Sequence, residues 1–293
     1  MTSTGIERLN AYLRAQPPKS AAPTDMRAWF LELIAVTPIP DGAKLEPSTC
    51  PVPASWINPE GADAGRVILY CHGGAYVLGS PATHLEMVHR FAKAASARAL
   101  SVDYRLLPEN PYPACIDDVL HAYRYLLNEG IAASHIAIAG DSAGGGITMS
   151  AALRIREGGL PQPGCLVCFS PWVDFTVSGE SIKTNADWDA MVDARLLPKL
   201  SQMILNGQDP TSSSPLFADL SNLPPLLVQA GKHEVLLDDS RKLAERYKEA
   251  GGSVVLEAWD KMTHVFQAFP TFVPEATEAI ERAGAFVKEK LGS

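Results

Sequence analysis

The sequence predicts an α/β protein with one mostly parallel β-sheet and helices on both of its faces. Two observations predict this fold. Short apolar runs alternate with helical patterns from residue 66 onward, which is typical of consecutive βαβ units. The runs are nearly continuous in apolar residues, as expected of strands that are covered on both faces. The expected strands are 66–71, 98–103, 135–139, 165–170, 225–230 and 253–258.

Helices are expected between these strands because apolar residues recur there at helical spacing. Ile116, Val119 and Tyr123 form one such stripe, and the glycine pair at 158–159 ends the helix predicted over 143–157. The expected helices are 26–36, 116–127, 143–157, 240–250 and about 280–287.

Two irregular segments indicate the domain organisation. Residues 1–60 are punctuated by prolines, and the interval of about 175–223 contains no convincing strand. We expect 61–293 to form the core, and both irregular segments to form a discontinuous helical cap over the edge where the strands end. Ligands bind at that edge in doubly wound sheets.

Composition and charge exclude several classes of protein. The chain of 293 residues carries a net charge of −8, which opposes binding to nucleic acid and to anionic membrane surfaces. Its longest apolar stretches run only about five to seven residues, too short for a transmembrane helix. The first residues lack the apolar region of a secretory signal. We therefore expect a cytoplasmic protein.

The cysteines predict neither a disulfide scaffold nor a metal site. The chain has five cysteines, an odd number at low density. Cys165 and Cys168 have the spacing of a redox or metal motif, but they lie in a predicted strand, where residues three apart point to opposite faces. We interpret both cysteines as buried core residues. The low cysteine content further predicts that the protein resides in a reducing compartment.

A candidate nucleophile lies between a predicted strand and a predicted helix. Gly140, Ser142 and Gly144 form the pattern Gly-x-Ser-x-Gly, and this placement is the one expected of a nucleophile elbow. So sharp a turn strains the backbone and needs very small neighbours. The alternatives are a turn that merely packs and a phosphate-binding loop. The spacings of the known phosphate and dinucleotide loops do not match.

A second motif, His-Gly-Gly-Ala-Tyr at 72–76, follows the strand expected at 66–71. Its small residues allow backbone N–H groups to face a pocket. Two such groups, together with the N–H of Ala143, would form an oxyanion hole. The alternative is a simple turn from strand to loop.

At this point the chain resembles the hormone-sensitive-lipase family of α/β-hydrolases, in its bacterial esterase branch. The resemblance covers about 65–290. It rests on HGGAY at 72–76, DYRLLPENPYPA at 103–114, GDSAGG at 140–145, SPWVD at 170–174, and His264. It implies the α/β-hydrolase fold, a two-part cap, a Ser–acid–His triad and, frequently, a homodimer formed along the last strand.

The resemblance bears on single residues as well. The family usually has a third glycine where this chain has Ala75, which leaves Gly73 and Gly74 as the expected oxyanion donors beside Ala143. The family likeness further implies a structural ion pair between Arg105 and Glu109.

The order of the triad in α/β-hydrolases is serine, acid, histidine. Only His233 and His264 follow the elbow, and His264 lies in the loop after the last predicted strand. We therefore expect His264 to be the general base. The loop after the strand at 225–230 supplies the acid.

Two residues of that loop fit the family's acid pattern, Glu234 at its first position and Asp238 at its second. We expect Glu234 to be the triad acid. The other candidate, Asp238, or its neighbour Asp239, would then cap or charge the N-terminus of the following helix.

The predicted function is a serine carboxylesterase for small, largely apolar esters, which needs no metal or organic cofactor. The alternatives are a lactone, amide or carbamate hydrolase with the same triad, and a non-catalytic small-molecule receptor. The receptor branch of the family lacks the catalytic histidine, which argues against the last. The expected substrate pocket consists of Tyr76, Trp29, Phe30, Trp188 and Met191.

Overall fold

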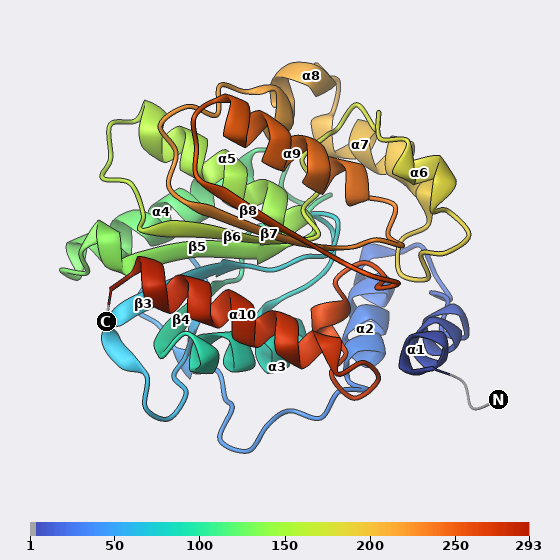
Figure 1. The fold of residues 1–293 in the computed structure, drawn as a ribbon, viewed down its shortest axis with the longest axis horizontal. Coiled ribbons are helices and arrows are strands. Elements are labelled where there is room, and N and C mark those ends of the chain that lie inside the picture. The colour runs from blue at the N-terminus through green and yellow to red at the C-terminus, as the bar shows by residue number, and fades with distance from the viewer. Residues whose placement is uncertain (1–3, 293) are drawn as a thin grey trace.

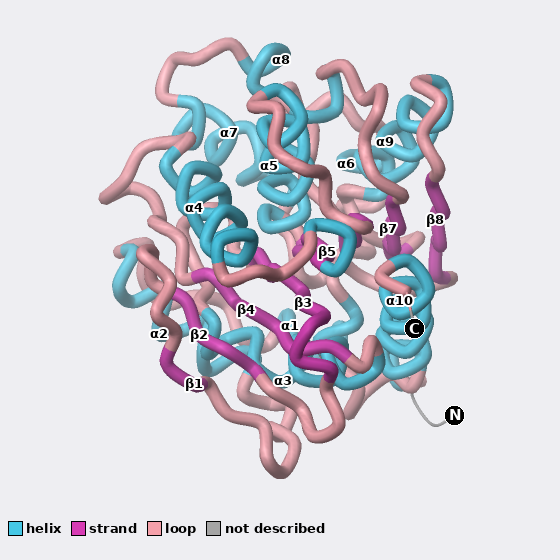
Figure 2. The backbone as a smooth tube through the Cα atoms, turned by 90° about the vertical axis from the view of Figure 1, so that its left-hand side faces the viewer, coloured by secondary structure: helices cyan, strands magenta, loops and turns pink. Residues whose placement is uncertain are grey.

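A computed structural model describes residues 4–292 and is built on an eight-stranded β-sheet (Figure 1). The strands lie in the order β1-β2-β4-β3-β5-β6-β7-β8. Figure 2 shows β1 and β2 at one edge of the sheet and β8 at the other. The strands are β1 Glu46–Pro47, β2 Ala54–Ile57, β3 Asp63–Cys71, β4 Ala97–Val102, β5 Ile136–Asp141, β6 Cys165–Phe169, β7 Leu226–Gly231 and β8 Val254–Trp259.

The strands from β3 to β8 pair in parallel, and β1 and β2 pair antiparallel. All six strands expected from the apolar runs are present, which confirms the predicted α/β fold. Because β4 and β5 lie on opposite sides of β3, the order of the strands reverses beside β3. Such a reversal is where doubly wound sheets bind ligands, so it marks the region to inspect.

The strands β1 and β2 belong to the stretch that the sequence analysis assigned to the cap. Pro47 lies in β1, at the edge of the sheet, where a residue without an N–H is tolerated. Within this stretch, residues 46–47 and 54–57 therefore belong to the sheet. The proline pattern hid these strands because both are short.

Helices cover the two faces of the sheet (Figure 1). One face carries α3 (Pro81–Ala94) and α10 (Glu275–Lys290), and the other carries α4 (Ala114–Asn128), α5 (Ala143–Glu157) and α9 (Leu237–Glu249). The helix α3 begins with a capping box of Ser80 and Thr83. None of these helices, nor any other within residues 4–292, is both long and apolar enough to cross a membrane.

The alternation of side chains along β6 shows how the two core layers form. Cys165, Val167 and Phe169 point into one apolar cluster, and Leu166 and Cys168 point into the other. The two cysteines therefore face opposite sides of the sheet, as the strand periodicity predicts. All five cysteines are unpaired.

Of the remaining helices, α1, α2, α6 and α7 lie on the right of Figure 1, and α8 lies at its top. The side chain of Arg14 in α1 donates to the carbonyl oxygen of Asp187 in the insertion at 2.6 Å, so the two irregular segments touch. The N-terminal helices are α1 Gly5–Arg14 and α2 Pro23–Ile34. The insertion contains α6 Ser181–Thr184, a 3-10 turn at Ala194–Leu196, α7 Leu197–Leu205, α8 Pro210–Ser213 and a 3-10 turn at Pro215–Phe217.

The ion pair expected between Arg105 and Glu109 is wrong. Arg105 pairs instead with Asp118 of α4 at 2.8 Å. Glu109 accepts two hydrogen bonds from Arg27 of α2, at 3.0 and 2.8 Å. The same guanidinium donates to the carbonyl oxygens of Val77 and Leu107, so Arg27, with Glu109 as its partner, fastens α2 to the core.

Candidate active site

Ser142 lies on the turn between β5 and α5, in a strained backbone conformation with φ 54° and ψ −119°. Positive φ is costly for a residue with a Cβ and persists only where the surroundings enforce it. A Cβ at Gly144 would collide with the carbonyl oxygens of Cys71 and His72. The small residues of the motif thus allow the turn to cross the end of β3.

Backbone hydrogen bonds tie the Ser142 turn to the loop after β6. The N–H of Ser142 donates to Phe169 at 2.8 Å, and its carbonyl oxygen accepts from the N–H of Trp172 at 3.0 Å. Both backbone polar groups of Ser142, its N–H and its carbonyl oxygen, are therefore held by the end of β6 and the loop that follows it.

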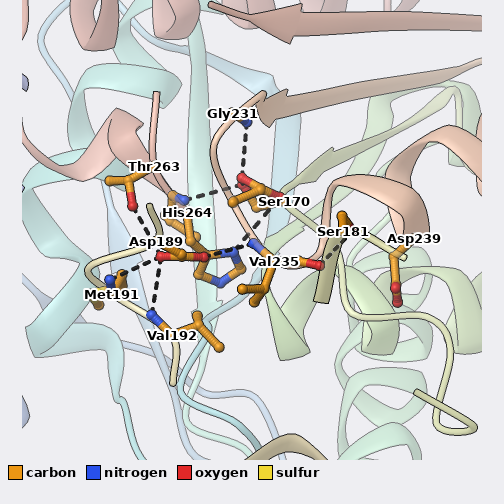
Figure 3. A network of polar contacts seen from close by, with 12 residues as sticks. Ser170, Ser181, Asp189, Met191, Val192, Gly231, Val235, Asp239, Thr263 and His264 are labelled. Carbon is orange, nitrogen blue, oxygen red and sulfur yellow. Dashed lines mark hydrogen bonds and ion pairs between the residues drawn. The ribbon is translucent and has the colours of Figure 1, made fainter. Parts of the chain in front are cut away.

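The carboxylate of Glu234 is fully buried at the end of β7. Its Oε2 accepts hydrogen bonds from the hydroxyl of Ser170 at 2.6 Å and the N–H of Gly231 at 2.9 Å. Its Oε1 lies 3.8 Å from Nδ1 of His264. Figure 3 shows His264 beside Thr263. Neither Oε1 nor Nδ1 has a hydrogen-bond partner within the described residues. Catalytic hydrogen bonds are often this long before substrate binds.

His264 lies in the loop after β8 and is almost completely buried. Burial alone would lower the pKa of the imidazole, but Glu234, followed by Asp189 and Asp141, raises the pKa above its ordinary value. Ser170 supports the same loop, since its hydroxyl oxygen accepts from the N–H of Val265 at 3.1 Å. A proton taken up by His264 is therefore stabilised by a buried opposite charge.

The competing acid, Asp238, points elsewhere. Its carboxylate accepts from the N–H of Ser181 in the insertion at 2.9 Å and lies 3.5 Å from Arg241. Of the two roles expected for Asp238 or Asp239, the cap is wrong, because the cap position of α9 is Leu236 and no side chain caps it. The other role, a negative charge at the N-terminus of the helix, is confirmed. Both aspartates lie in the first helical turn, and Asp239 accepts backbone N–H bonds of the 173–174 segment at 2.9 Å each.

The structure corrects one expected oxyanion donor. The N–H of Gly73 donates to the carboxylate of Asp141 at 2.9 Å and is not available for a ligand. The N–H groups of Gly74, Ala75 and Ala143 have no hydrogen-bond acceptor within the described residues. Gly74 has φ 119° and Ala75 has φ 53°, so a left-handed turn exposes the two amides. The Ala75 amide, which sequence comparison discounted, is therefore open.

Two of the expected pocket residues lie in the core. Tyr76 is 2% exposed and packs edge-on against Tyr112 and Trp172, and Phe30 is 6% exposed beside His84. Both side chains pack against other aromatic rings, as large aromatic residues commonly do in a core.

The other three pocket candidates lie nearer the surface. Trp29 is half-buried and donates its indole N–H to the carbonyl of Gln16 at 2.8 Å. Trp188 is 56% exposed, and its ring centre lies 5.0 Å from that of His233 in the acid loop. Met191 is half-buried and follows Asp189 closely. Trp188 and Met191 thus remain as pocket candidates of the insertion: Trp188 lies beside the acid loop, and the N–H of Met191 donates to Asp189.

Sequence reasoning missed Ser170, Asp189 and Thr263. Ser170 had a usable signal, because it follows β6 directly and so lies at the sheet edge where the site forms. Asp189 and Thr263 had none, since they lie in irregular segments and meet across 74 positions of the chain. Residues 4–292 contain no group of His, Cys, Asp and Glu side chains arranged to hold a metal ion.

A serine on a strained strand-to-helix turn and a histidine beside a buried carboxylate, all at the carboxyl edge of this sheet, are features of the α/β hydrolases. The chain belongs to that family: the family described as alpha/beta hydrolase fold matches residues 68–268.

Particular relatives narrow the class. An acetyl-hydrolase of Streptomyces hygroscopicus is 41% identical over 82% of this chain and 80% of its own length. An esterase of Acinetobacter venetianus is 37% identical over 77% of this chain and 75% of its own length. The crystal structure of an esterase from the bacterial hormone-sensitive lipase family superposes with a TM-score of 0.95, at 42% identity and 100% coverage of both chains. The protein is a carboxylic ester hydrolase of this esterase branch.

Proposed function

We propose that the esterase acts through a triad of Ser142, His264 and Glu234. The Ser142 hydroxyl attacks the acyl carbon of the ester while His264 takes its proton. His264 then gives the proton to the departing alcohol, which leaves an acyl-enzyme. Water, deprotonated by His264, attacks the acyl carbon and releases the carboxylic acid and the free serine. No cofactor takes part in these steps.

The observation that carries this proposal is the buried contact between His264 and Glu234, in which Nδ1 lies 3.8 Å from Oε1. The hydroxyl of Ser170 contacts Glu234 and the residue after His264, and the neighbouring Phe169 accepts from the nucleophile's N–H. The end of β6 and the residue that follows it thus support all three proposed catalytic residues.

We propose the N–H groups of Gly74 and Ala143, with that of Ala75, as the oxyanion hole. Their support is that none of them has a partner within the described residues, and that Ala143 begins α5. The positive end of the helix dipole then faces the negative charge that develops on the ester oxygen.

The proposed substrates are small, largely apolar esters. Half-buried Met191 and partly exposed Trp188 offer apolar contact in the insertion, and one relative is named an acetyl-hydrolase. A panel of esters of increasing acyl length, with lactones, anilides and carbamates beside them, tests this. Turnover of anilides or lactones above that of esters would contradict it.

The cap, the compartment and the oligomer are proposals too. We assign α1, α2 and the insertion at about 175–223 to the cap, with the remainder as the core. The five unpaired thiols support a reducing, cytoplasmic location. Val255 and Leu256 are 45% and 37% exposed on β8, at the end of the sheet, which supports a homodimer along that edge.

Replacing the nucleophile tests the mechanism. Ser142→Ala should lower kcat for p-nitrophenyl butyrate by about 10⁴-fold or more, with the fold retained by circular dichroism. Ser150→Ala changes a second serine of α5 and should keep nearly full activity. A folded Ser142→Ala enzyme that retains a tenth of the activity would contradict the proposal.

A further inference from the structure

Asp189 is a buried carboxylate of the inserted segment that the triad chemistry does not use. It is 7% exposed and accepts four hydrogen bonds. Its Oδ1 accepts from the N–H groups of Met191 and Val192, at 2.9 and 3.2 Å, and from the hydroxyl of Thr263 at 3.0 Å. Its Oδ2 accepts from the N–H of Val235 at 2.9 Å.

Two of these donors are chain neighbours of proposed triad residues. Thr263 directly precedes His264, and Val235 directly follows Glu234. Figure 3 shows the Asp189 carboxylate with Thr263 on one side and Val235 on another. A single side chain of the insertion therefore contacts both the histidine loop and the acid loop.

A second contact joins the insertion to the acid loop. The amide group of Asn185 donates to the carbonyl oxygens of Lys232 and Glu234, at 3.1 and 2.9 Å. The inserted segment is thus attached to the acid loop at two points, Asn185 and Asp189.

Besides its hydrogen bonds, Asp189 brings a negative charge to the region of His264. All four of its hydrogen-bond donors are uncharged, so no bonded cation neutralises the carboxylate. The ionisable groups that act on His264 are Glu234 from the acid loop, Asp189 from the insertion and Asp141 from the end of β5. In so buried a site, an anion near the imidazole favours its protonated form.

We propose that Asp189 is a positioning residue of the esterase: it fixes the histidine and acid loops against the insertion, and its negative charge stabilises the imidazolium of His264 formed during acyl transfer. The proposal rests on the assignment of His264 as the general base. It makes the inserted segment part of the catalytic apparatus, in addition to any role in substrate choice.

The test replaces the charge and retains the shape. Asp189→Asn leaves an oxygen for the Met191, Val192 and Thr263 bonds, but it removes the charge and the acceptor of the Val235 N–H. We expect kcat for p-nitrophenyl butyrate to fall roughly 10–100-fold, with KM changed less than about threefold, because the loss is of transition-state stabilisation. The acid limb of kcat/KM should move to lower pH by roughly 0.5–1, since loss of an anion lowers the pKa of His264.

Two matched variants separate charge from attachment. Thr263→Val removes one hydrogen bond to Asp189 and keeps its charge, so kcat should fall less and the acid limb should stay in place. Asp193→Asn changes a carboxylate of the same segment that bonds only within its own turn, to Arg195. It should change neither quantity.

Three results would overturn the proposal: unchanged kinetics in folded Asp189→Asn, a lower kcat with an unmoved acid limb, or an equal limb shift in Asp193→Asn. If Asp189→Asn does not fold, Asp189→Ser, which leaves room for water beside the four donors, carries the same expectations. Failure of the triad itself is distinguishable, because Ser142→Ala or His264→Ala would then remain active.

Discussion

Ser170 shows how much one small side chain contributes to the arrangement of the site. Its hydroxyl donates to Glu234 and accepts from Val265, so it fixes the acid and the loop of the base at once. Glu234 is fully buried, and a buried carboxylate keeps its geometry only when its oxygens are hydrogen-bonded. One Glu234 oxygen is satisfied in this way, and the other faces His264.

The choice between the two acids gives a residue-scale prediction. Glu234→Gln should lower kcat about 10⁴-fold, because His264 loses the charge that orients it. Its melting temperature should change little. Asp238→Asn should keep most activity and lower the melting temperature by about 1–2 °C, through a weaker pair with Arg241 and a weaker charge at the start of α9.

Both variants are compared by steady-state kinetics and thermal unfolding in one buffer. A stable, inactive Asp238→Asn beside an active Glu234→Gln would move the acid to Asp238. The 2.9 Å bond from Asp238 to Ser181 argues against that outcome, because it directs the carboxylate to α6.

At the scale of elements, the sequence predicts those helices and strands whose apolar residues follow a regular pattern. The parallel strands β3 to β7 are apolar runs because helices cover both of their faces, so the runs alone locate them. The edge strand β8 has the same apolar composition, although Val255 and Leu256 are partly exposed. The helix α5 begins and ends at the predicted residues, 143 and 157. The short edge strands β1 and β2 have no such pattern.

The helix α3 escaped prediction for a different reason. His84, Glu86 and His89 are all buried in it, so polar residues occupy positions that a periodic apolar pattern would need. Glu86 is satisfied by Arg90, four residues further along the helix, at 2.6 Å. Burial is compatible with polar residues where such partners exist, but sequence periodicity does not show the partners.

The same distinction applies to the site. Ser142, Glu234 and His264 each follow the end of a strand, a place that sequence patterns identify. Asp189 binds Val235 and Thr263 across 46 and 74 positions, and only the docked insertion brings them together.

The cap gives an element-scale prediction about substrate choice. Trp188→Ala should change the ratio of kcat/KM for butyrate and decanoate esters roughly 5–150-fold, because apolar contacts discriminate at about 1–3 kcal/mol per methylene-sized feature. Leu196→Ala removes another exposed apolar side chain of the insertion and should leave the ratio unchanged. Equal loss for both esters in Trp188→Ala would mean that Trp188 only packs against His233.

At the scale of the whole molecule, one buried acid couples stability to pH. Burial raises the pKa of Asp239 to about 8, against opposing hydrogen bonds from the N–H groups of Val173 and Asp174. The protonated form is thus favoured in the folded state. Its stabilising contribution is complete below the ordinary aspartate pKa of about 4 and is lost as pH rises through about 8.

Asp239→Asn should remove this dependence, because an amide oxygen accepts the same backbone bonds without ionising. We expect the drop in urea midpoint between pH 6 and pH 9 to be smaller in Asp239→Asn than in the wild type. Asp219→Asn, at an exposed carboxylate, serves as the control. An equal drop in all three proteins would show that Asp239 is already ionised at pH 6.

The span of the Ser170 contacts has a consequence for the order of chain assembly. The hydroxyl joins partners that lie 64 and 95 positions further along the chain. Closing loops of this length costs entropy, and the contacts form only after the intervening strands have paired. The base arrives after β8, the last strand of the sheet. A chain that stops before β8 has its serine but no histidine, so the proposed triad requires β8 and the loop that follows it.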